Sequence, residues 1–425
     1  MKFNIYTLGC KVNTYESNVM SDLLKENGFV EVKIDEMADI SIINTCTVTN
    51  TADNKSMKII RHAIKKNPNA IIVVCGCMSQ HRSHDVENID GVDIVLGNKN
   101  KSQIVSYINK YIDTHNKKSD IYNLENIPFE TMKLNNFNKV RAFVKIQDGC
   151  NNFCTYCIIP YTRGNVRSKD KDSVLSEINN LIKEGHKEIV LTGIHTGHYG
   201  SEFDNYSFSD LLEDILKIKG LERLRISSIE ITELDDKFFK LLNDNKILVD
   251  HMHIPLQTGT DSVLKRMNRK YNIDYFINKI EKIRTIRPDI SITTDVIVGF
   301  PGETDEEFNN TIENIKKINF SKIHVFPFSK RDGTKASLMD NQIEPTLKKE
   351  RVKKLINISK ELEMNYMNKF INKDIIMLPE VYKDGYLIGH TGNYLLVKVK
   401  GTKEELNQDK KVKIVEVNYP YVIGK

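Results

Sequence analysis

Three cysteines within eight residues constrain this 425-residue chain more than any other feature. Cys150, Cys154 and Cys157 form the pattern C-x-x-x-C-x-x-C. The apolar run 142–146 before them predicts a strand, and residues 158–164, which contain a proline and a glycine, predict a loop. The three thiols are therefore expected on one loop beyond the end of a strand, where they can converge on one metal centre.

An iron–sulfur cluster is the centre that this spacing favours, because Cys thiolates are the usual ligands of such clusters. Tetrahedral zinc takes four ligands, and no fourth cysteine falls at local spacing. Disulfides are disfavoured in a chain that we expect to be cytosolic. A four-iron cluster held by three thiolates leaves one iron open to a small ligand.

The loop resembles that of the radical S-adenosylmethionine (SAM) enzymes, and specifically the methylthiotransferases. The resemblance rests on the three cysteines, the preceding strand and the sequel Ile-Ile-Pro-Tyr-Thr-Arg-Gly. It implies a [4Fe-4S] cluster whose open iron binds the amino and carboxylate groups of SAM.

Length and composition predict two or three ordinary globular domains, with 40% hydrophobic and 28% charged residues. A net charge of +5 is too small to indicate nucleic-acid binding by itself. No apolar run approaches the ~20 residues that span a bilayer, and no signal-peptide pattern opens the sequence. We expect a soluble cytoplasmic protein without a membrane partner, whose seven cysteines serve metal or redox chemistry.

Residues 1–100 predict an α/β domain with an open parallel sheet, because short apolar runs alternate with segments of helical periodicity. The apolar runs lie at residues 3–8, 40–44, 70–74 and 92–96. The first two helical segments lie at residues 15–27 and 51–66.

Four further cysteines follow these predicted strands. Cys10 follows the first strand, Cys46 the second, and Cys75 and Cys77 the third. Ligand sites in open parallel sheets form at the carboxyl ends of the strands, so a second three-thiolate cluster is predicted at Cys10, Cys46 and Cys77. Cys75 continues an apolar run and suits a small buried hydrophobe better than a ligand.

The N-terminal segments also resemble the methylthiotransferases. The matching residues are Thr-Leu-Gly-Cys-Lys-Val-Asn-Thr-Tyr-Glu-Ser at 7–17, Asn-Thr-Cys-Thr-Val-Thr at 44–49 and Gly-Cys-Met at 76–78. The resemblance implies that Cys10, Cys46 and Cys77 bind an auxiliary [4Fe-4S] cluster that serves as the sulfur site. Cys75 stays the alternative third ligand.

Residues 140–330 predict an open parallel barrel, a partial (β/α)6 arrangement resembling part of a TIM barrel and the radical SAM fold. Strand-like runs lie at residues 142–146, 188–191, 223–227, 251–255, 291–298 and 322–326. Helical segments lie at residues 173–184, 209–218, 235–242, 273–284 and 305–318.

Polar residues follow the predicted barrel strands at the carboxyl edge that carries Cys150. For any single one, a turn or cap role is the competing interpretation. The resemblance implies that the set lines the SAM pocket, and its members are Thr192, Gly193, Glu230, Gln257 and Asp295. His195 and His198 are expected as substrate or solvent contacts rather than metal ligands.

The remaining segments predict a linker at residues 101–139, a basic helical connector at 331–370 and a small β-barrel at 371–425. The basic start of the connector suits phosphates. Aromatic and basic side chains interleave in the last segment and suit RNA bases and phosphates. Residues 384–394 resemble the RNA-binding TRAM domain that ends these enzymes.

Within the family, residues 9–17 and 145–150 most resemble the tRNA enzymes that act on N6-threonylcarbamoyladenosine (t6A) beside the anticodon. This resemblance implies that the Cys150 cluster passes an electron to SAM and yields a 5′-deoxyadenosyl radical. The radical takes hydrogen from C2 of the adenine. The auxiliary cluster then delivers a sulfur, methylated by a second SAM, to C2. The implied partners are the tRNA anticodon stem-loop, an electron donor such as flavodoxin or ferredoxin, and a sulfur source.

Three alternatives remain at this point. The nearest is methylthiolation of N6-isopentenyladenosine in tRNA. The second alternative is modification of an aspartate in a ribosomal protein, which is the activity of a third relative. Tyr15 in the first motif argues against this alternative. A non-catalytic iron–sulfur protein that binds tRNA or transfers electrons belongs to a different class, and the open-iron motif with its polar barrel rim argues against it.

Overall fold

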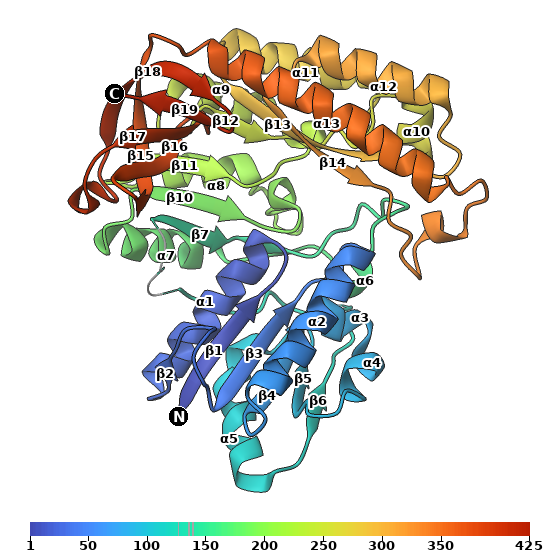
Figure 1. Ribbon diagram of the computed structural model, residues 1–425, viewed down its shortest axis with the longest axis vertical. Coiled ribbons are helices and arrows are strands. Elements are labelled where there is room, and N and C mark those ends of the chain that lie inside the picture. Colours follow the sequence, from blue (N-terminus) through green and yellow to red (C-terminus); the bar gives the residue numbers. More distant parts are fainter. Residues whose placement is uncertain (126, 135–136, 138–139) are drawn as a thin grey trace.

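A computed structural model describes the chain except residues 126, 135–136 and 138–139 (Figure 1). An N-terminal α/β unit forms one end of the molecule. The central barrel lies beside it, and the C-terminal strands pack against the central barrel at the other end. The α/β fold class expected from the sequence is confirmed, with parallel sheets followed by a small barrel of antiparallel and parallel strands.

The N-terminal unit is a parallel sheet in the order β2-β1-β3-β4-β5-β6. Its strands are β1 (Lys2–Thr7), β2 (Val30–Glu31), β3 (Ile40–Thr45), β4 (Ile71–Gly76), β5 (Ile94–Leu96) and β6 (Lys118–Asp120). Its helices are α1 (Lys11–Glu26), α2 (Asn50–Lys66), α3 (Cys77–His81), α4 (Ser83–Glu87), η1 (Lys101–Gln103) and α5 (Ile104–Thr114). Helices cover both faces of β3 and β4, which is why both strands are apolar throughout and fully buried.

The predicted linker at residues 101–139 is shorter in the structure. Ile104 and Ile108 are completely buried against the sheet, which makes α5 part of the N-terminal unit. β6 extends the sheet through parallel pairing with β5. The connection therefore begins after Asp120, and part of this predicted linker lies outside the described residues.

The central barrel consists of two parallel sheets, ordered β11-β10-β7 and β12-β13-β14, that meet where Leu224 bridges to Leu248. Its strands are β7 (Arg141–Lys145), β10 (Glu188–Thr192), β11 (Arg223–Ile226), β12 (His251–His253), β13 (Ser291–Val298) and β14 (Lys322–Pro327). The helices between them are α7 (Lys171–Lys183), α8 (Phe208–Leu216), α9 (Asp236–Asp244), α10 (Asp261–Arg266), α11 (Ile273–Ile286) and α12 (Asp305–Ile318). The partial TIM-like arrangement expected from the sequence is confirmed.

Shorter elements decorate the carboxyl edge of the central barrel. They are β8 (Gln147–Asp148), α6 (Ile159–Arg163), β9 (Arg167–Ser168), η2 (Thr196–His198), η3 (Ile231–Glu233) and η4 (Lys335–Leu338). Side-chain caps fix where the barrel helices begin. At α12, Thr304 accepts the N–H of Glu307 while Glu307 accepts the N–H of Thr304, which satisfies two donors that a helix start leaves free.

The C-terminal part begins with α13 (Pro345–Asn368), which packs along β14 through Leu355 and Leu362. A closed barrel follows in the order β15-β16-β17-β19-β18. Its strands are β15 (Asp374–Lys383), β16 (Tyr386–Thr391), β17 (Leu396–Lys400), β18 (Lys410–Asn418) and β19 (Tyr421–Gly424), with η5 (Lys403–Glu405) between β17 and β18. Alternate residues fill its core, including Val397 and Val399. The small β-barrel expected from the sequence is confirmed.

Among the described residues, no helix combines the length and apolar character needed to cross a membrane.

Candidate functional site

The first cysteine loop leaves β8 through Gly149, whose φ is +75°. A Cβ at this position would lie 1.9 Å from the carbonyl oxygen of Asn165, so the sharp turn into Cys150 requires glycine. The N–H of Cys157 donates to the carbonyl of Cys154 over 2.9 Å, which curls the loop back on itself. Cys150, Cys154 and Cys157 are free and partly exposed on this curl.

The electrostatics of this loop disfavour free thiolates. Burial raises the pKa of Cys150 to about 12, and it also raises the pKa of Cys157 to about 12. Repulsion from Cys154 contributes to both shifts, because the thiolates lie near one another. Such thiols stay protonated at neutral pH unless a cation replaces their protons. The donor set therefore fits a cluster better than free thiolates.

Arg269 connects the cysteine loop to the barrel rim. Its Nη1 donates to Sγ of Cys154 over 3.3 Å, and its Nη2 forms an ion pair with Glu230. The preceding residue, Asn268, donates from Nδ2 to the carbonyl oxygens of Asn152 and Phe153. The segment after α10 thus holds the cysteine loop in place and brings the predicted Glu230 beside it.

The other predicted rim residues fall into two groups. Thr192 ends β10, and Gly193 packs against Gln147, so these two lie next to the first cysteine loop. Gln257 and Asp295 lie side by side at the β12–β13 edge, where the N–H of Gln257 donates to the carbonyl of Asp295 over 2.9 Å. No hydrogen bond joins the two groups within the part of the chain that the structure describes.

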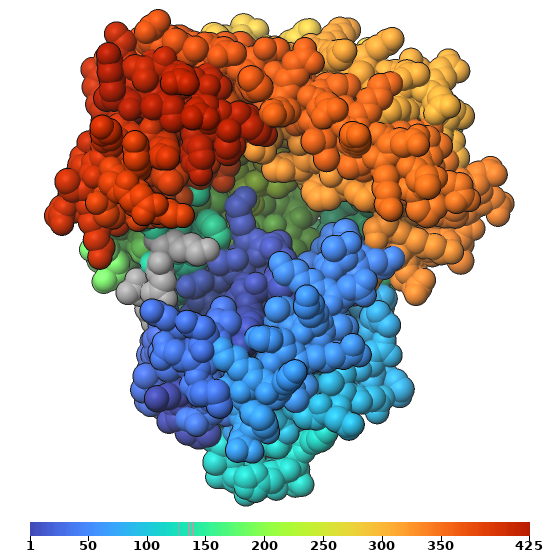
Figure 2. Space-filling model, viewed as in Figure 1, coloured from blue at the N-terminus to red at the C-terminus, as the bar shows by residue number. Residues whose placement is uncertain are grey.

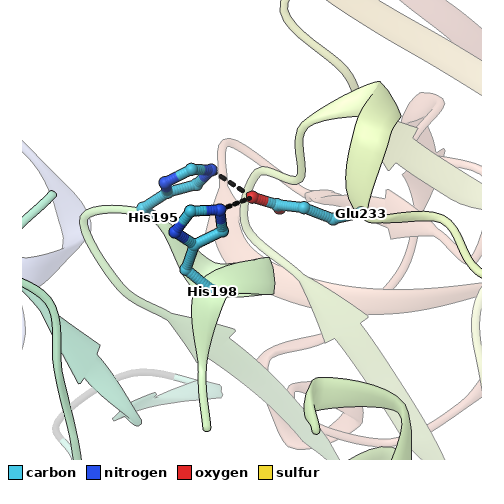
Figure 3. A group of neighbouring side chains, drawn as sticks. All are labelled: His195, His198 and Glu233. Atoms are coloured by element: carbon cyan, nitrogen blue, oxygen red, sulfur yellow. Dashed lines mark ion pairs between the residues drawn. The ribbon is translucent and has the colours of Figure 1, made fainter. Parts of the chain in front are cut away.

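His195 and His198 stack with their ring centroids 3.8 Å apart, and both rings face Glu233 (Figure 3). Nδ1 of His195 lies 3.6 Å from Sγ of Cys150. Burial lowers the pKa of His195 to about 4 and raises the pKa of Glu233 to about 7. Burial also lowers the pKa of His198, so both rings are neutral at pH 7, and the Glu233 carboxyl group is near its titration point.

The nitrogen and oxygen atoms of this histidine–glutamate group lie within 4.8 Å of one another, a spacing that suits a metal ion. Glu233 also has a structural role, because it accepts the N–H of Glu230 and closes the first turn of η3. The sequence-based interpretation of His195 and His198 as substrate or solvent contacts stays a prediction.

The second set of cysteines lies at the carboxyl edge of the N-terminal sheet. Cys10 precedes α1, Cys46 follows β3, and Cys77 begins α3. The first two loops touch at Gly9, where φ is +94° and a Cβ would lie 2.8 Å from Cβ of Cys46. Burial raises the pKa of Cys46 to about 11, and repulsion from Cys77 is the next cause. The three thiols therefore share one location.

Cys75 lies elsewhere. It is the penultimate residue of β4 and is completely buried in an apolar cluster with Phe3 and Ile108. Cys46 packs in the other apolar cluster of this sheet with Val74, so Cys75 faces the opposite side from Cys46. Burial raises the pKa of Cys75 to about 12, which keeps it a neutral thiol.

The two cysteine sets meet at Arg163, the last residue of α6. Its Nε donates to Sγ of Cys77 over 3.4 Å, and Nδ2 of Asn98 donates to the same sulfur over 3.4 Å. Asn98 also donates to the carbonyl oxygen of Thr162 over 2.7 Å. The loop after Cys157 therefore packs directly on the site of Cys77.

Two matches cover the two cysteine-bearing units. Residues 144–315 match the Radical SAM superfamily, and residues 2–97 match the Uncharacterized protein family UPF0004. The threonylcarbamoyladenosine tRNA methylthiotransferase MtaB of Bacillus subtilis (strain 168) is 42% identical over 427 residues, which cover 99% of this chain and 95% of that protein. This chain belongs to the radical SAM methylthiotransferase family.

Two further comparisons place this methylthiotransferase among its relatives. The tRNA-2-methylthio-N(6)-dimethylallyladenosine synthase of Carboxydothermus hydrogenoformans is 34% identical and covers 97% of this chain and 96% of that protein. The structure of the radical S-adenosylmethionine methyltransferase TsrM from Kitasatospora setae, with cobalamin and a [4Fe-4S] cluster bound, gives a TM-score of 0.56. It is 12% identical and covers 77% of this chain and 74% of that chain, so the likeness shows the fold alone.

As a radical SAM methylthiotransferase, the protein uses SAM and [4Fe-4S] clusters. The residues present fit these groups. Each of the two locations gathers three free cysteines, and each also presents a buried arginine N–H to one sulfur, from Arg269 at Cys154 and from Arg163 at Cys77. Donors of this kind suit the negative charge that thiolate-bound clusters carry.

The C-terminal barrel of this methylthiotransferase is fastened to the central barrel by Tyr394. The Tyr394 ring stacks with His251 of the central barrel and with His390 of the C-terminal barrel, and the ring centroids are 4.5 Å apart in each pair. The Arg225 guanidinium lies 4.8 Å from the Tyr394 ring centroid. Figure 2 shows the surface hollowed where the N-terminal unit, the central barrel and the C-terminal barrel meet.

Sequence reasoning missed Arg163, Arg269 and Asn98 as contacts of the cysteine sites. Arg163 did stand in the quoted segment Ile-Ile-Pro-Tyr-Thr-Arg-Gly, where its short distance from Cys157 was the available signal. Asn98 follows β5 at the same sheet edge as the N-terminal cysteines, so the edge rule could have found it. Arg269 has no comparable signal, because it precedes a barrel helix rather than following a strand.

Proposed function

We propose that this protein methylthiolates C2 of N6-threonylcarbamoyladenosine next to the anticodon of tRNA, giving 2-methylthio-N6-threonylcarbamoyladenosine. The observation that carries the proposal is the 42% identity with the Bacillus subtilis enzyme over nearly the whole chain. The relative named for dimethylallyladenosine has 34% identity over a similar length. The t6A enzyme is therefore the better supported of the two tRNA functions.

We assign the radical SAM cluster to Cys150, Cys154 and Cys157 and the auxiliary cluster to Cys10, Cys46 and Cys77. When bound, these groups supply the electron for cleavage of SAM and the sulfur for insertion at C2. Support for the assignment comes from the way each set of thiols gathers at the carboxyl edge of its own parallel sheet.

The chain's own residues would orient SAM at the first cysteine loop. Glu230 presents a carboxylate that suits the SAM ammonium group, and Arg269 fixes that carboxylate through their ion pair. We assign the remaining rim residues to the same pocket, and these are Thr192, Gly193, Gln257 and Asp295. Their positions at strand ends support this assignment, because ligands bind there in such barrels.

We propose the following division of labour. The unit from residue 1 to about residue 100, extended by α5 and β6, holds the auxiliary cluster, and residues 140–330 hold SAM. Residues 331–370 connect to the C-terminal barrel, and residues 371–425 form a TRAM-like surface for tRNA. The exposed ring of Tyr382 supports an RNA-binding role, because exposed aromatic side chains stack on bases.

The partners follow from the chemistry. The substrate is an anticodon stem-loop of tRNA that carries the modified adenosine. We propose that a one-electron carrier such as flavodoxin or ferredoxin reduces the radical SAM cluster, and that a separate sulfur source restores the auxiliary site. The cytoplasm, where tRNA is modified, is the proposed location.

The decisive experiment offers two tRNAs to the anaerobically reconstituted protein with SAM, a reductant and sulfide. One tRNA carries t6A and the other carries N6-isopentenyladenosine, and nucleoside mass spectrometry reads the products. A methylthio product on the first tRNA only supports the proposal. A methylthio product on the second tRNA only supports the reaction type but contradicts t6A as the substrate. No product on either tRNA supports the non-catalytic alternative.

A further inference from the structure

Arg163 is the largest fully buried side chain in the molecule's described part, and the proposed reaction gives it no role. It belongs to α6, directly after the first cysteine loop, yet it contacts the N-terminal unit. Its Nη2 donates to Oδ1 of Asn13 over 2.7 Å, and its Nη1 donates to Oε1 of Glu16 over 2.7 Å. One side chain thus reaches from the radical SAM loop into the wall of the second cysteine site.

The contact with Cys77 is the unusual one. Nε of Arg163 and Nδ2 of Asn98 each donate to Sγ of Cys77 over 3.4 Å, so this sulfur receives two N–H groups. Asn13, which Arg163 holds, in turn accepts a weak contact from Sγ of Cys10 at 3.9 Å. The arginine therefore contacts one cysteine of the second site directly and reaches another through one intermediate.

The charges around Arg163 do not balance. Glu16 and Asp148 are the buried carboxylates that the guanidinium contacts. Lys101 and Lys145 also pair with these two carboxylates, and Arg167 lies 3.6 Å from Asp148. The positive charges in this contact set outnumber the negative ones, and Arg163 brings part of this positive charge beside the sulfur of Cys77. An anionic thiolate at Cys77 offsets this excess.

We propose that Arg163, assisted by Asn98, is a positioning residue for the auxiliary cluster. Arg163 holds the ligand Cys77 against the radical SAM loop and stabilises the reduced state of the cluster. The proposal rests on the assignment of Cys10, Cys46 and Cys77 as cluster ligands. N–H groups directed at a cluster sulfur, and nearby positive charge, favour the form with the extra electron. Their loss makes the midpoint potential more negative.

The test isolates the auxiliary cluster. The chain with Cys150→Ala, Cys154→Ala and Cys157→Ala lacks the other site, so its remaining iron signal reports one cluster. In this background, Arg163→Lys keeps the positive charge and removes the Nε donor. Electron paramagnetic resonance during a dye-mediated reductive titration gives the midpoint potential, and iron analysis gives the loading.

We expect Arg163→Lys to load iron and to shift the potential downward by about 59 mV, the equivalent of a tenfold change for one electron. Arg287→Lys is the matched control, because Arg287 is also a buried arginine and its guanidinium donates to Leu242, Asn245 and Asp250 rather than to a cysteine. It should leave the potential unchanged, which separates a local effect on the cluster from a general loss of packing.

Asn98→Ser supplies an independent arm, because it removes the other N–H donor and leaves Arg163 in place. It should shift the midpoint potential in the same direction. This measurement still tests the proposal if Arg163→Lys fails to fold. Loaded variants with the parent potential overturn the role of Arg163 and Asn98. A parent triple variant without iron overturns the auxiliary site itself, and the methylthiolation assay of the unmodified protein then decides separately whether the proposed function stands.

Discussion

Nη1 of Arg269 donates a hydrogen bond to Sγ of Cys154 over 3.3 Å. The two residues lie 115 positions apart in the chain, and the arginine is almost completely buried. Because the same guanidinium pairs with Glu230, one side chain fixes both a proposed cluster ligand and a proposed SAM contact. We therefore expect the geometry of the proposed SAM site to depend on the planar guanidinium of Arg269.

Arg269→Lys should slow SAM cleavage by at least about tenfold, because an ammonium group cannot make both contacts in the geometry of a guanidinium. The measurement is the rate of 5′-deoxyadenosine release under dithionite, at iron loading equal to the parent. Arg287→Lys is the control for buried arginine loss. Parent-like rates and SAM affinity in Arg269→Lys would show that the arginine is purely structural.

The two cysteine sets should separate in function. Cys154→Ala is expected to abolish SAM cleavage, because it removes a proposed ligand of the cluster that reduces SAM. Cys46→Ala is expected to keep the cleavage and lose the methylthio product. Both are read from one anaerobic reaction by quantifying 5′-deoxyadenosine and modified nucleoside. Methylthio product from Cys46→Ala would remove Cys46 from the auxiliary site.

Cys75→Ala should retain both activities and lose about 1 kcal/mol of stability, because it truncates a small buried side chain in an apolar cluster. Iron and sulfide per chain should equal those of the parent. Cys77→Ala is the matched comparison two residues away and should lose iron. If the iron contents of these two variants were reversed, Cys75 would be the third ligand.

Tyr394→Ala should weaken the attachment of the C-terminal barrel, because the ring stacks with His251 of the central barrel and with His390 of the C-terminal barrel. We expect a stability loss of about 3 kcal/mol and at least a tenfold rise in KM for tRNA, with SAM cleavage in the absence of tRNA unchanged. Thermal melting and product formation at varied tRNA concentration measure the two effects. Tyr382→Ala, an exposed tyrosine of the same barrel, controls for the melting temperature.

Glu307 should make the stability of the apo-protein depend on acid pH. Hydrogen bonds from Arg266 lower the pKa of Glu307 to about 2. A carboxyl group with a lowered folded pKa stabilises the fold above its unfolded pKa of about 4.3, and this stabilisation is lost as pH falls from there toward 2. Allowing for solvent screening, the contribution is about 1 to 2 kcal/mol.

Glu307→Gln is therefore expected to flatten the fall of melting temperature between pH 5 and 3. The control is Glu306→Gln, which changes an exposed neighbour on the same helix turn. An identical acid profile for parent and Glu307→Gln would show that the Arg266 pair contributes nothing to stability.

Local patterns were sufficient to predict the succession of strands and helices along the chain. Apolar runs such as residues 70–74 become strands, and the cysteines after them share an edge, because the carboxyl ends of parallel strands meet there. Helical periodicity predicted a helix at residues 305–318, and α12 occupies the same residues. These features depend on residues that are close together in the sequence, so they can be predicted without knowledge of the tertiary structure.

Contacts between distant segments were not predictable in this way. Arg163 and Cys77 are 86 residues apart, and no periodicity connects them. The membership of α5 in the N-terminal unit was also missed, because only the burial of Ile104 and Ile108 against the sheet distinguishes it from a linker helix. Such features depend on tertiary packing rather than on local propensity.

The surplus of buried positive charge around Glu16 and Asp148 has a consequence for the lifetime of the protein. Under the proposed assignment of Cys10, Cys46 and Cys77, oxygen that destroys the auxiliary cluster also removes anionic charge that offsets Lys101, Lys145 and Arg163. The oxidised chain then holds these cations together at a cost in free energy, and the contact between the first two units opens more often. We therefore expect loss of the cofactor to make the chain more susceptible to proteases.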